Sequence, residues 1–272
     1  MIKDITAGQF FPGNSLLHKT DARFKIMILL VFLVTVLASS STASFAVVLG
    51  LTVILVTLSE INIKVILRSV KPLAFILAFT AIINLFFVKG QSEPLVEWQF
   101  IHIYKEGIIN SVMLMLRLIC LVMGTSVILT YTTSPLDMTD GLERVLSPLR
   151  FIGVPVHDFA MILTIALRFI PTLVEETDKI ISAQKSRGVS FDTGGLIKRV
   201  KALIPILIPL FYSAVRRALE LAEAMECRLY TGGKGRTRMK VLHCTARDFI
   251  FLFVMLAICV GIFFMNGYEI IR

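Results

Sequence analysis

Residues 171–230 read PTLVEETDKIISAQKSRGVSFDTGGLIKRVKALIPILIPLFYSAVRRALELAEAMECRLY, and the rest of the chain can be interpreted from this stretch. It contains two helical patterns, of which the first ends near Arg187 and the second near Arg228. Both patterns are amphipathic and charged, although the chain around them is mostly apolar. Because arginine stays charged and offers a fork of donors to carboxylates, we interpret the two helix ends as surfaces for an acidic partner.

The first helical pattern follows Pro171. Apolar or neutral side chains recur there at the i, i+3, i+4 and i+7 spacing of one helical face. Acidic residues gather in the first turn and basic ones in the last, as the helix dipole favours. Gly188 is a candidate for the left-handed residue that follows many helices. We therefore expect Arg187 at the tip of this helix.

The second pattern begins after Gly195 and ends near Arg228, 41 residues beyond Arg187. Charged residues again occupy one side, and Gly232 and Gly233 follow the end. Two helices of similar size joined by a short linker can present two arginines at separate, roughly equivalent points. The residues alone leave a second interpretation open, in which both arginines only follow the preference of basic side chains for helix C-termini.

The composition identifies a membrane protein. Of the 272 residues 56% are hydrophobic, against about 45–50% in soluble domains, and the mean hydropathy is +0.81. The net charge is +9, which in a membrane protein is first explained by Lys and Arg in cytoplasmic loops. Nucleic-acid binding is not expected, because the basic region carries many acidic residues and few aromatic platforms. The four cysteines form no CxxC pair, so no metal site is predicted.

About five membrane-spanning helices are expected, with four as the main alternative if residues 26–59 do not form two spans. A span needs about 20 apolar residues, so the apolar residues 26–59 are too many for one span and predict a hairpin of two short spans that turns near Ser41. Arg117 lies inside an apolar run, where a charge is costly, and should therefore face the helix bundle or a partner. The preferred interpretation is structural: Arg117 either pairs with a neighbouring helix or extends its side chain toward the membrane surface. The remaining spans are expected at about 72–88, 107–131 and 248–266.

The long segment before the last span is expected on the same side as the N-terminus. Residues 134–247 contain 17 Lys and Arg against 11 Asp and Glu, and an even number of spans precedes them, so both criteria indicate the cytoplasm. The fold class is therefore an all-α integral membrane protein with a cytoplasmic or interfacial domain of long amphipathic helices. Its expected divisions are 1–131 with four spans, 132–247 with the amphipathic helices, and 248–272 with the final span.

Residues 151–170 and 202–215 are also apolar enough to cross a membrane. Charged residues within the first and two prolines within the second favour helices that lie along the membrane face or partly enter it. If both crossed instead, they would form a hairpin and Arg187 would lie on the far side.

An enzyme is not expected, because the chain lacks Walker A, HExxH and GxSxG motifs. The segment Thr231–Gly235 resembles a phosphate-binding loop, but Arg228 stands where its first glycine would be. A self-sufficient multi-pass membrane carrier stays open as the alternative. It would need polar or ionisable sites at the membrane midplane, and only Arg117 and Asn84 qualify.

Several short motifs follow one another along the chain: Ser15–Lys25, Thr133–Pro135 followed by Leu142–Glu143, Arg168–Pro171, Ser186–Arg187–Gly188 and Glu226–Cys227–Arg228–Leu229. In this order they resemble the T subunits of energy-coupling factor transporters, the family of CbiQ-like and EcfT proteins. That family carries two motifs built around Ala-Arg-Gly, each at the end of a cytoplasmic coupling helix. The second motif departs from the pattern here, because Leu229 replaces the usual glycine.

The resemblance implies a non-catalytic scaffold in the cell membrane of a prokaryote. It would join two ABC ATPase subunits, expected to be a heterodimer, to a substrate-binding membrane S subunit for vitamin or metal-ion uptake. The motifs around Arg187 and Arg228 would each dock on one ATPase, with Glu226, Arg168 and Pro171 in supporting positions. ATP would be bound by the partner subunits, and no cofactor or metal by this chain.

Overall fold

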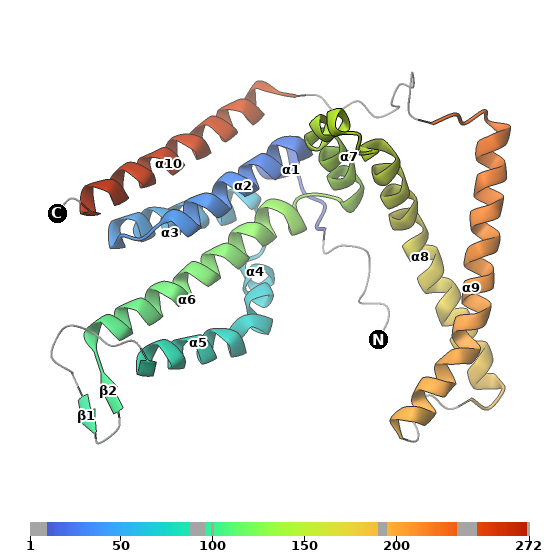
Figure 1. Cartoon of the computed structure of the whole chain (residues 1–272), viewed down its shortest axis with the longest axis horizontal. Coiled ribbons are helices and arrows are strands. Elements are labelled where there is room, and N and C mark those ends of the chain that lie inside the picture. Colours follow the sequence, from blue (N-terminus) through green and yellow to red (C-terminus); the bar gives the residue numbers. More distant parts are fainter. Residues whose placement is uncertain (1–9, 88–95, 99–100, 190–194, 233–243, 271–272) are drawn as a thin grey trace. The chain divides into compact units, whose positions relative to one another are not determined.

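The computed structural model describes residues 10–87, 96–98, 101–189, 195–232 and 244–270. The described chain is almost entirely helical (Figure 1). A short antiparallel hairpin is the exception, in which β1 (Val96–Trp98) pairs with β2 (Ile101–Ile103) and Glu97 lies opposite His102. The expected all-α membrane architecture is confirmed.

The chain forms two compact units. Of the described residues, 10–87, 96–98, 101–144 and 244–270 form the first, called here the bundle unit, and 145–189 and 195–232 form the second, the helix-pair unit. The bundle unit consists of α1 (Leu16–Lys19), α2 (Ala22–Ala38), α3 (Thr42–Ser59), α4 (Ile63–Val70), the 3-10 turn η1 (Lys71–Leu73), α5 (Ala74–Phe87), α6 (Lys105–Thr125), the π-helical segment η2 (Ser126–Tyr131), α7 (Pro135–Val145) and α10 (Ala246–Ile270).

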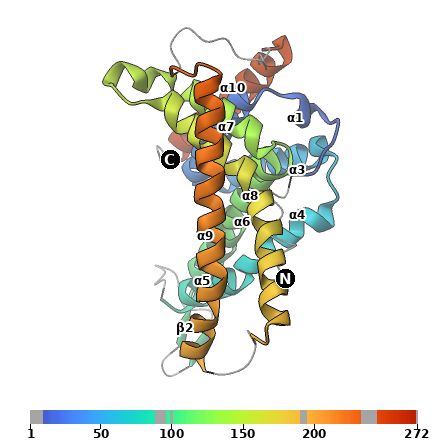
Figure 2. The ribbon, with the colours of Figure 1, turned by 90° about the vertical axis from the view of Figure 1, so that its right-hand side faces the viewer.

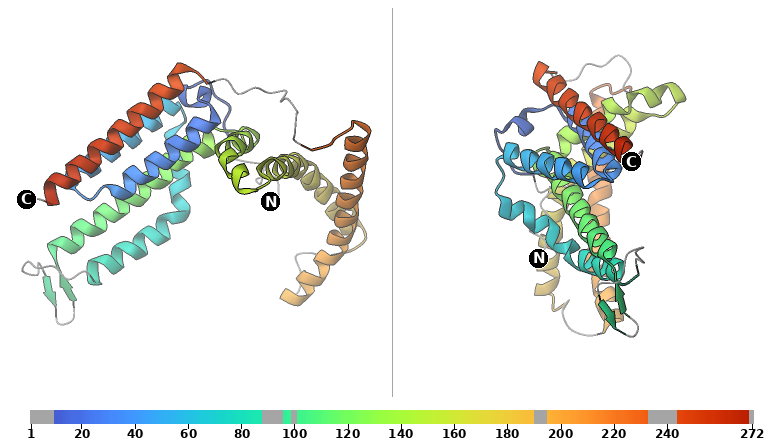
Figure 3. Two further views of the ribbon diagram at one scale, coloured as in Figure 1. Left: turned by 45° about the horizontal axis from the view of Figure 1, so that its top comes forward. Right: turned by 90° about the vertical axis from the view of Figure 1, so that its left-hand side faces the viewer.

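The hairpin expected near Ser41 is confirmed. Helix α2 ends at Ala38, and α3 begins after Ser41, whose side chain accepts a hydrogen bond from the N–H of Ala43. Helix α10 packs along α2 (Figure 3). Where α2 meets α6, a Cβ on Gly124 would overlap the ring of Phe32, which is fully buried. Only glycine therefore allows the two helices to approach this closely.

Arg117 of α6 binds the turn between α2 and α3. Its guanidinium donates to the carbonyl of Ser39 and lies 5.0 Å from the ring centroid of Phe45. Asn266 of α10 donates to the neighbouring carbonyl of Ala38. The last carbonyls of a helix have no partner within it, so side chains of α6 and α10 complete the end of α2. The expectation that Arg117 faces the bundle is confirmed.

Polar contacts also join the elements at the other end of α2. Lys25 is buried and donates to the carbonyl of Thr132 (2.7 Å) and the hydroxyl of Thr133 (3.2 Å). The hydroxyl of Tyr131 donates to the carbonyl of Val65 in α4. The start of α2, the end of η2 and the start of α4 therefore lie at one end of the bundle unit, called here its Lys25 end.

Six segments in the described part of the chain are long and apolar enough to cross a membrane. Helix α2, with 17 residues, is not among them. Two of the six belong to the long helices expected at the membrane face, so length and composition also allow those helices to cross. The six segments are Thr42–Ser59, Ile63–Leu85, Gly107–Tyr131, Val156–Ser186, Val200–Cys227 and Ala246–Asn266.

The helix-pair unit contains the 3-10 segment η3 (Ser147–Ile152) and two long helices, α8 (Val156–Ser186) and α9 (Leu196–Cys227). Figure 2 shows α8 and α9 running beside each other. Pro171 lies inside α8 rather than at the start of a helix, and Pro205 and Pro209 lie inside α9. A proline removes one backbone hydrogen bond from a helix interior. Both helices nevertheless continue through their prolines.

Candidate functional site

The first arginine-bearing helix end is the C-terminus of α8. Arg187 caps the helix with φ −83° and ψ 4°, and Gly188 follows in the left-handed region with φ 87°. The N–H of Gly188 donates to the carbonyl of Lys185 (3.0 Å), and that of Val189 to the carbonyl of Gln184 (3.1 Å). These two bonds define a Schellman motif, so the expectation that Gly188 follows the helix in a left-handed conformation is confirmed.

The C-terminus of α9 has the same backbone geometry. Arg228 caps it with φ −90° and ψ 12°, and Leu229 follows with φ 56°. The N–H of Leu229 donates to the carbonyl of Glu226 (2.8 Å), and that of Tyr230 to the carbonyl of Met225 (3.0 Å). This is a second Schellman motif, with leucine in the position of Gly188, although a left-handed backbone costs about 1–2 kcal/mol for a residue with a Cβ.

Both helix ends are open to their surroundings. Six of the predicted site residues, Ser186, Arg187, Gly188, Cys227, Arg228 and Leu229, are all exposed. A guanidinium at a helix C-terminus is stabilised by the partial negative charge of the last carbonyls, and an exposed guanidinium can form two parallel hydrogen bonds with a carboxylate. Within the described residues, no group of His, Cys, Asp and Glu side chains could hold a metal ion.

The two tips lie at opposite ends of the helix pair. Near the first tip, the Gln184 side chain donates to the carbonyl of Pro205 (3.4 Å). Near the second, the hydroxyl of Tyr230 donates to the sulfur of Met161 (2.9 Å). The helices are therefore antiparallel. The 23 residues between Pro205 and Arg228 correspond to roughly 35 Å of helix at about 1.5 Å per residue.

A polar cluster between the tips fastens α8 to α9. The carboxylate of Glu176 accepts hydrogen bonds from the hydroxyl of Ser213 (2.6 Å) and from the guanidinium of Arg217 (2.8 Å). The bond from Ser213 is the main cause that lowers the pKa of Glu176, burial opposes it, and Arg217 adds to it. The sequence placed Glu176 only on a charged helix face, because a partner 37 residues away leaves no local signal.

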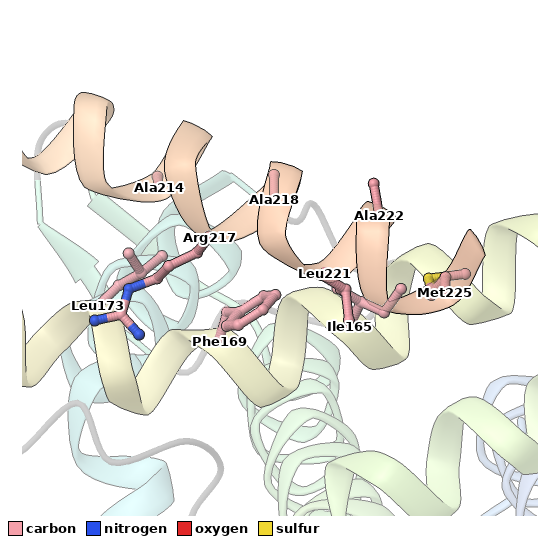
Figure 4. A pocket seen from close by; sticks show the side chains of 9 residues that line it. All are labelled: Ile165, Phe169, Leu173, Ala214, Arg217, Ala218, Leu221, Ala222 and Met225. Carbon is pink, nitrogen blue, oxygen red and sulfur yellow. The ribbon is translucent and has the colours of Figure 1, made fainter. Parts of the chain in front are cut away.

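Beside this cluster a small cavity of about 240 Å³ lies between the two helices (Figure 4). Its α9 wall includes alanines at every fourth position, which leave space beside the larger side chains of α8. Arg217 is its one charged lining residue. The cavity offers no set of polar groups that would orient a substrate. It is lined by Ile165, Phe169, Leu173, Ala214, Arg217, Ala218, Leu221, Ala222 and Met225.

The three supporting residues predicted from sequence lie in different places. Glu226 is exposed beside the second tip, where its carbonyl takes part in the Schellman motif. Arg168 and Pro171 are exposed in the middle of α8, 19 and 16 residues before Arg187. The structure therefore brings Glu226 to a tip and leaves the other two along the helix.

Comparisons with known proteins match the chain over almost its whole length. Residues 13–240 match the family model CbiQ, described as cobalt transport protein. The energy-coupling factor transporter transmembrane protein EcfT of Clostridium kluyveri is 47% identical over 263 residues, which are 96% of this chain and 97% of that protein.

Further relatives carry the same description. EcfT of Ruminiclostridium cellulolyticum is 50% identical over 248 residues, which cover 91% of this chain and 92% of the relative. EcfT of Bacillus subtilis is 36% identical over 267 residues and is covered completely, with 98% of this chain aligned. With its long apolar helices and its two arginine-tipped helix ends, the chain belongs to the CbiQ and EcfT family, the transmembrane components of energy-coupling factor transporters.

Proposed function

We propose that this chain is the scaffold that couples two ATPase subunits to a substrate-binding membrane subunit during vitamin or metal-ion import. The observation that carries the proposal is the pair of matching helix ends, each with an exposed arginine followed by a left-handed residue. Two equivalent docking points suit two similar partner chains. Each arginine would form a bidentate contact with a carboxylate of one ATPase, a geometry that lysine does not reproduce.

The helix pair would transmit the movement of the ATPases. ATP binding can shift the scaffold only through contacts that differ between the two states of the complex. The tips supply such contacts when the ATPase subunits approach each other. The cluster of Glu176, Ser213 and Arg217 holds α8 against α9, so displacement of one tip would carry the other helix along. The chain itself would be non-catalytic, and ATP would stay with the partner subunits.

The antiparallel arrangement supports a helix pair that lies along the cytoplasmic membrane face. If α8 and α9 both crossed the membrane, Arg187 and Arg228 would lie on opposite sides, and one could not reach a cytoplasmic ATPase. Exposed apolar residues form a row along the middle of α9, as in helices that lie in the membrane interface. The row includes Val200, Leu203, Leu207, Phe211 and Val215. We place residues 132–247 and the N-terminus in the cytoplasm and the spans in the cell membrane.

Co-purification of the tagged full chain from gently solubilised membranes tests the proposal. Two ATPase chains and a small membrane subunit should accompany the protein, and the double variant Arg187→Ala/Arg228→Ala should lose the ATPases. Arg216→Ala is the matched control, since Arg216 is an exposed arginine of α9 that pairs with Glu220 within its own helix (3.0 Å). Retention of both ATPases by the double variant would refute the docking role. Solute transport by the chain alone in liposomes would favour the self-sufficient carrier instead.

A further inference from the structure

A groove in the bundle unit combines a buried apolar floor with an open rim. It lies between α1, α3 and α10 and has a volume of about 570 Å³, within the range of about 300–1,000 Å³ typical of ligand sites. Ile54 and Val254 on its rim are 55% and 46% exposed, so the groove is accessible from outside the bundle. Its floor is formed by buried side chains, among them Leu17, Leu51, Leu55 and Met255.

One end of the groove is positively charged. Lys19 of α1 and Arg247 of α10 line this end, and both are exposed. Arg247 lies in the first turn of a 25-residue helix, where the helix dipole adds partial positive charge. The end also lies near the Lys25 end of the bundle unit, because α1 directly precedes α2. An anionic group would therefore be attracted to this end of the groove.

The carboxylate of Asp248, which also lines this end, does not cancel the charge. Asp248 is 3% exposed, and its carboxylate accepts the N–H of Thr245 (2.9 Å) at the start of α10. It also lies within electrostatic range of the buried Lys25. Its negative charge is therefore engaged inside the protein, while the two exposed charges at the groove end are both positive.

The length of the groove matches one leaflet of a bilayer. From Arg247 to Ile258 it follows α10 for 11 residues, which is roughly 16 Å of helix. The hydrocarbon core of a bilayer is about 30 Å thick, so half of it is about the same length. Helix α10 is long and apolar enough to cross the membrane. The groove would then run from the headgroup level to the middle of the bilayer.

We propose that this groove binds one anionic phospholipid. The headgroup phosphate contacts Lys19 and Arg247, and an acyl chain lies on the floor beside Leu51 and Met255. An extended polypeptide is a poorer occupant, because its backbone N–H and C=O groups would need partners that an apolar groove does not supply. An acyl chain has no such groups.

Quenching by brominated lipids tests the proposal on the full chain. A Val254→Trp reporter is placed on the groove rim in a background in which Trp98, the single tryptophan of the sequence, is replaced by Phe. The protein is reconstituted into phosphatidylcholine vesicles with increasing fractions of brominated phosphatidylglycerol or brominated phosphatidylcholine. Half-maximal quenching should need about tenfold less of the anionic lipid, because each basic side chain near the headgroups adds electrostatic attraction.

Two controls separate the groove from its surroundings. A Phe253→Trp reporter lies on the same helix at a position that is 73% exposed and does not line the groove, and it should respond equally to both lipids. The preference at Val254→Trp should disappear in Lys19→Gln/Arg247→Gln. It should persist in Arg68→Gln/Lys71→Gln, which removes two exposed charges elsewhere in the bundle unit.

Three results would overturn the proposal. The first is equal quenching of the Val254→Trp reporter by both lipids. The second is a preference for the anionic lipid that survives Lys19→Gln/Arg247→Gln. The third is protection of the Val254→Trp reporter from both lipids while the Phe253→Trp reporter is quenched, because a protein segment would then occupy the groove.

Discussion

The ends of α8 and α9 have the same backbone conformation and different residues at the position that determines it. Gly188 takes φ 87° after Arg187, and Leu229 takes φ 56° after Arg228. Glycine adopts this region at little cost, whereas leucine does not. Leu229 is 80% exposed, so packing within the helix-pair unit does not offset the cost. The comparison teaches that the helix end, with its arginine, is the shared feature, and that glycine is only the less costly way to form it.

Loss of either arginine should have the largest effect. If each arginine pairs with an ATPase carboxylate as proposed, Arg187→Ala or Arg228→Ala removes one partner of a desolvated charge pair, which costs about 2–5 kcal/mol of binding free energy. If the tips are equivalent, the two single variants should weaken ATPase binding to a similar extent. Titration of detergent-solubilised protein with the purified ATPases measures both losses. A loss confined to one variant would show that only one tip docks.

Gly188→Leu makes the first tip resemble the second, and it should give the next largest effect. A Cβ on Gly188 would meet no atom within 4 Å, so the cost lies in the left-handed backbone and should be about 1–2 kcal/mol. Thermal unfolding and ATPase titration should both report it. Gly261→Leu in α10 is the matched control, since its Cβ also meets nothing within 4 Å but its φ lies outside the positive range. Equal destabilisation by both variants would contradict a backbone cause.

Leu229→Gly is the reciprocal change and should be nearly neutral. It relieves the left-handed strain of leucine, but it also adds conformational freedom to the unfolded chain, worth about 0.4–1 kcal/mol. Assembly with the ATPases should therefore be retained, and the unfolding temperature should change little. Complete loss of assembly in a pull-down would show that the Leu229 side chain itself contacts a partner, and the tips would not be equivalent.

Acidification should have the smallest effect. It should affect both tips together, because Glu176 of α8 binds Ser213 and Arg217 of α9. The pKa of Glu176 is lowered from its ordinary value of 4.5, so the ionised carboxylate stabilises the folded pair. That stabilisation is fully present above about pH 4.5 and is lost as the pH falls through the lower folded pKa. Hydrogen exchange at α8 and α9 should rise there in the unmodified chain. Glu176→Gln should remove this pH dependence, and an unchanged profile in that variant would exclude Glu176 as its source.

Local features of the sequence predicted the first tip and the hairpin turn well. Gly188 after a basic last turn and Ser41 within an apolar run are signals carried by neighbouring residues. Leu229 carries no such signal, because leucine is rarely left-handed, and only the hydrogen bonds reveal its role. Pro171 suggested a boundary because proline disfavours helix interiors, yet α8 continues through it. Contacts between distant segments, such as Glu176 with Arg217, leave no pattern in the sequence.

The capping of α2 has a consequence for how the protein is made. The carbonyl of Ser39 is bound by Arg117, 78 residues later, and that of Ala38 by Asn266, 228 residues later. A buried backbone carbonyl without a hydrogen-bond partner costs about 1–3 kcal/mol. The hairpin of α2 and α3 therefore has all these hydrogen bonds only after α6 and α10 have been synthesised and have packed against it. A chain truncated before α10 would leave the carbonyl of Ala38 without the amide of Asn266, so we expect its hairpin to be less stable than in the full chain.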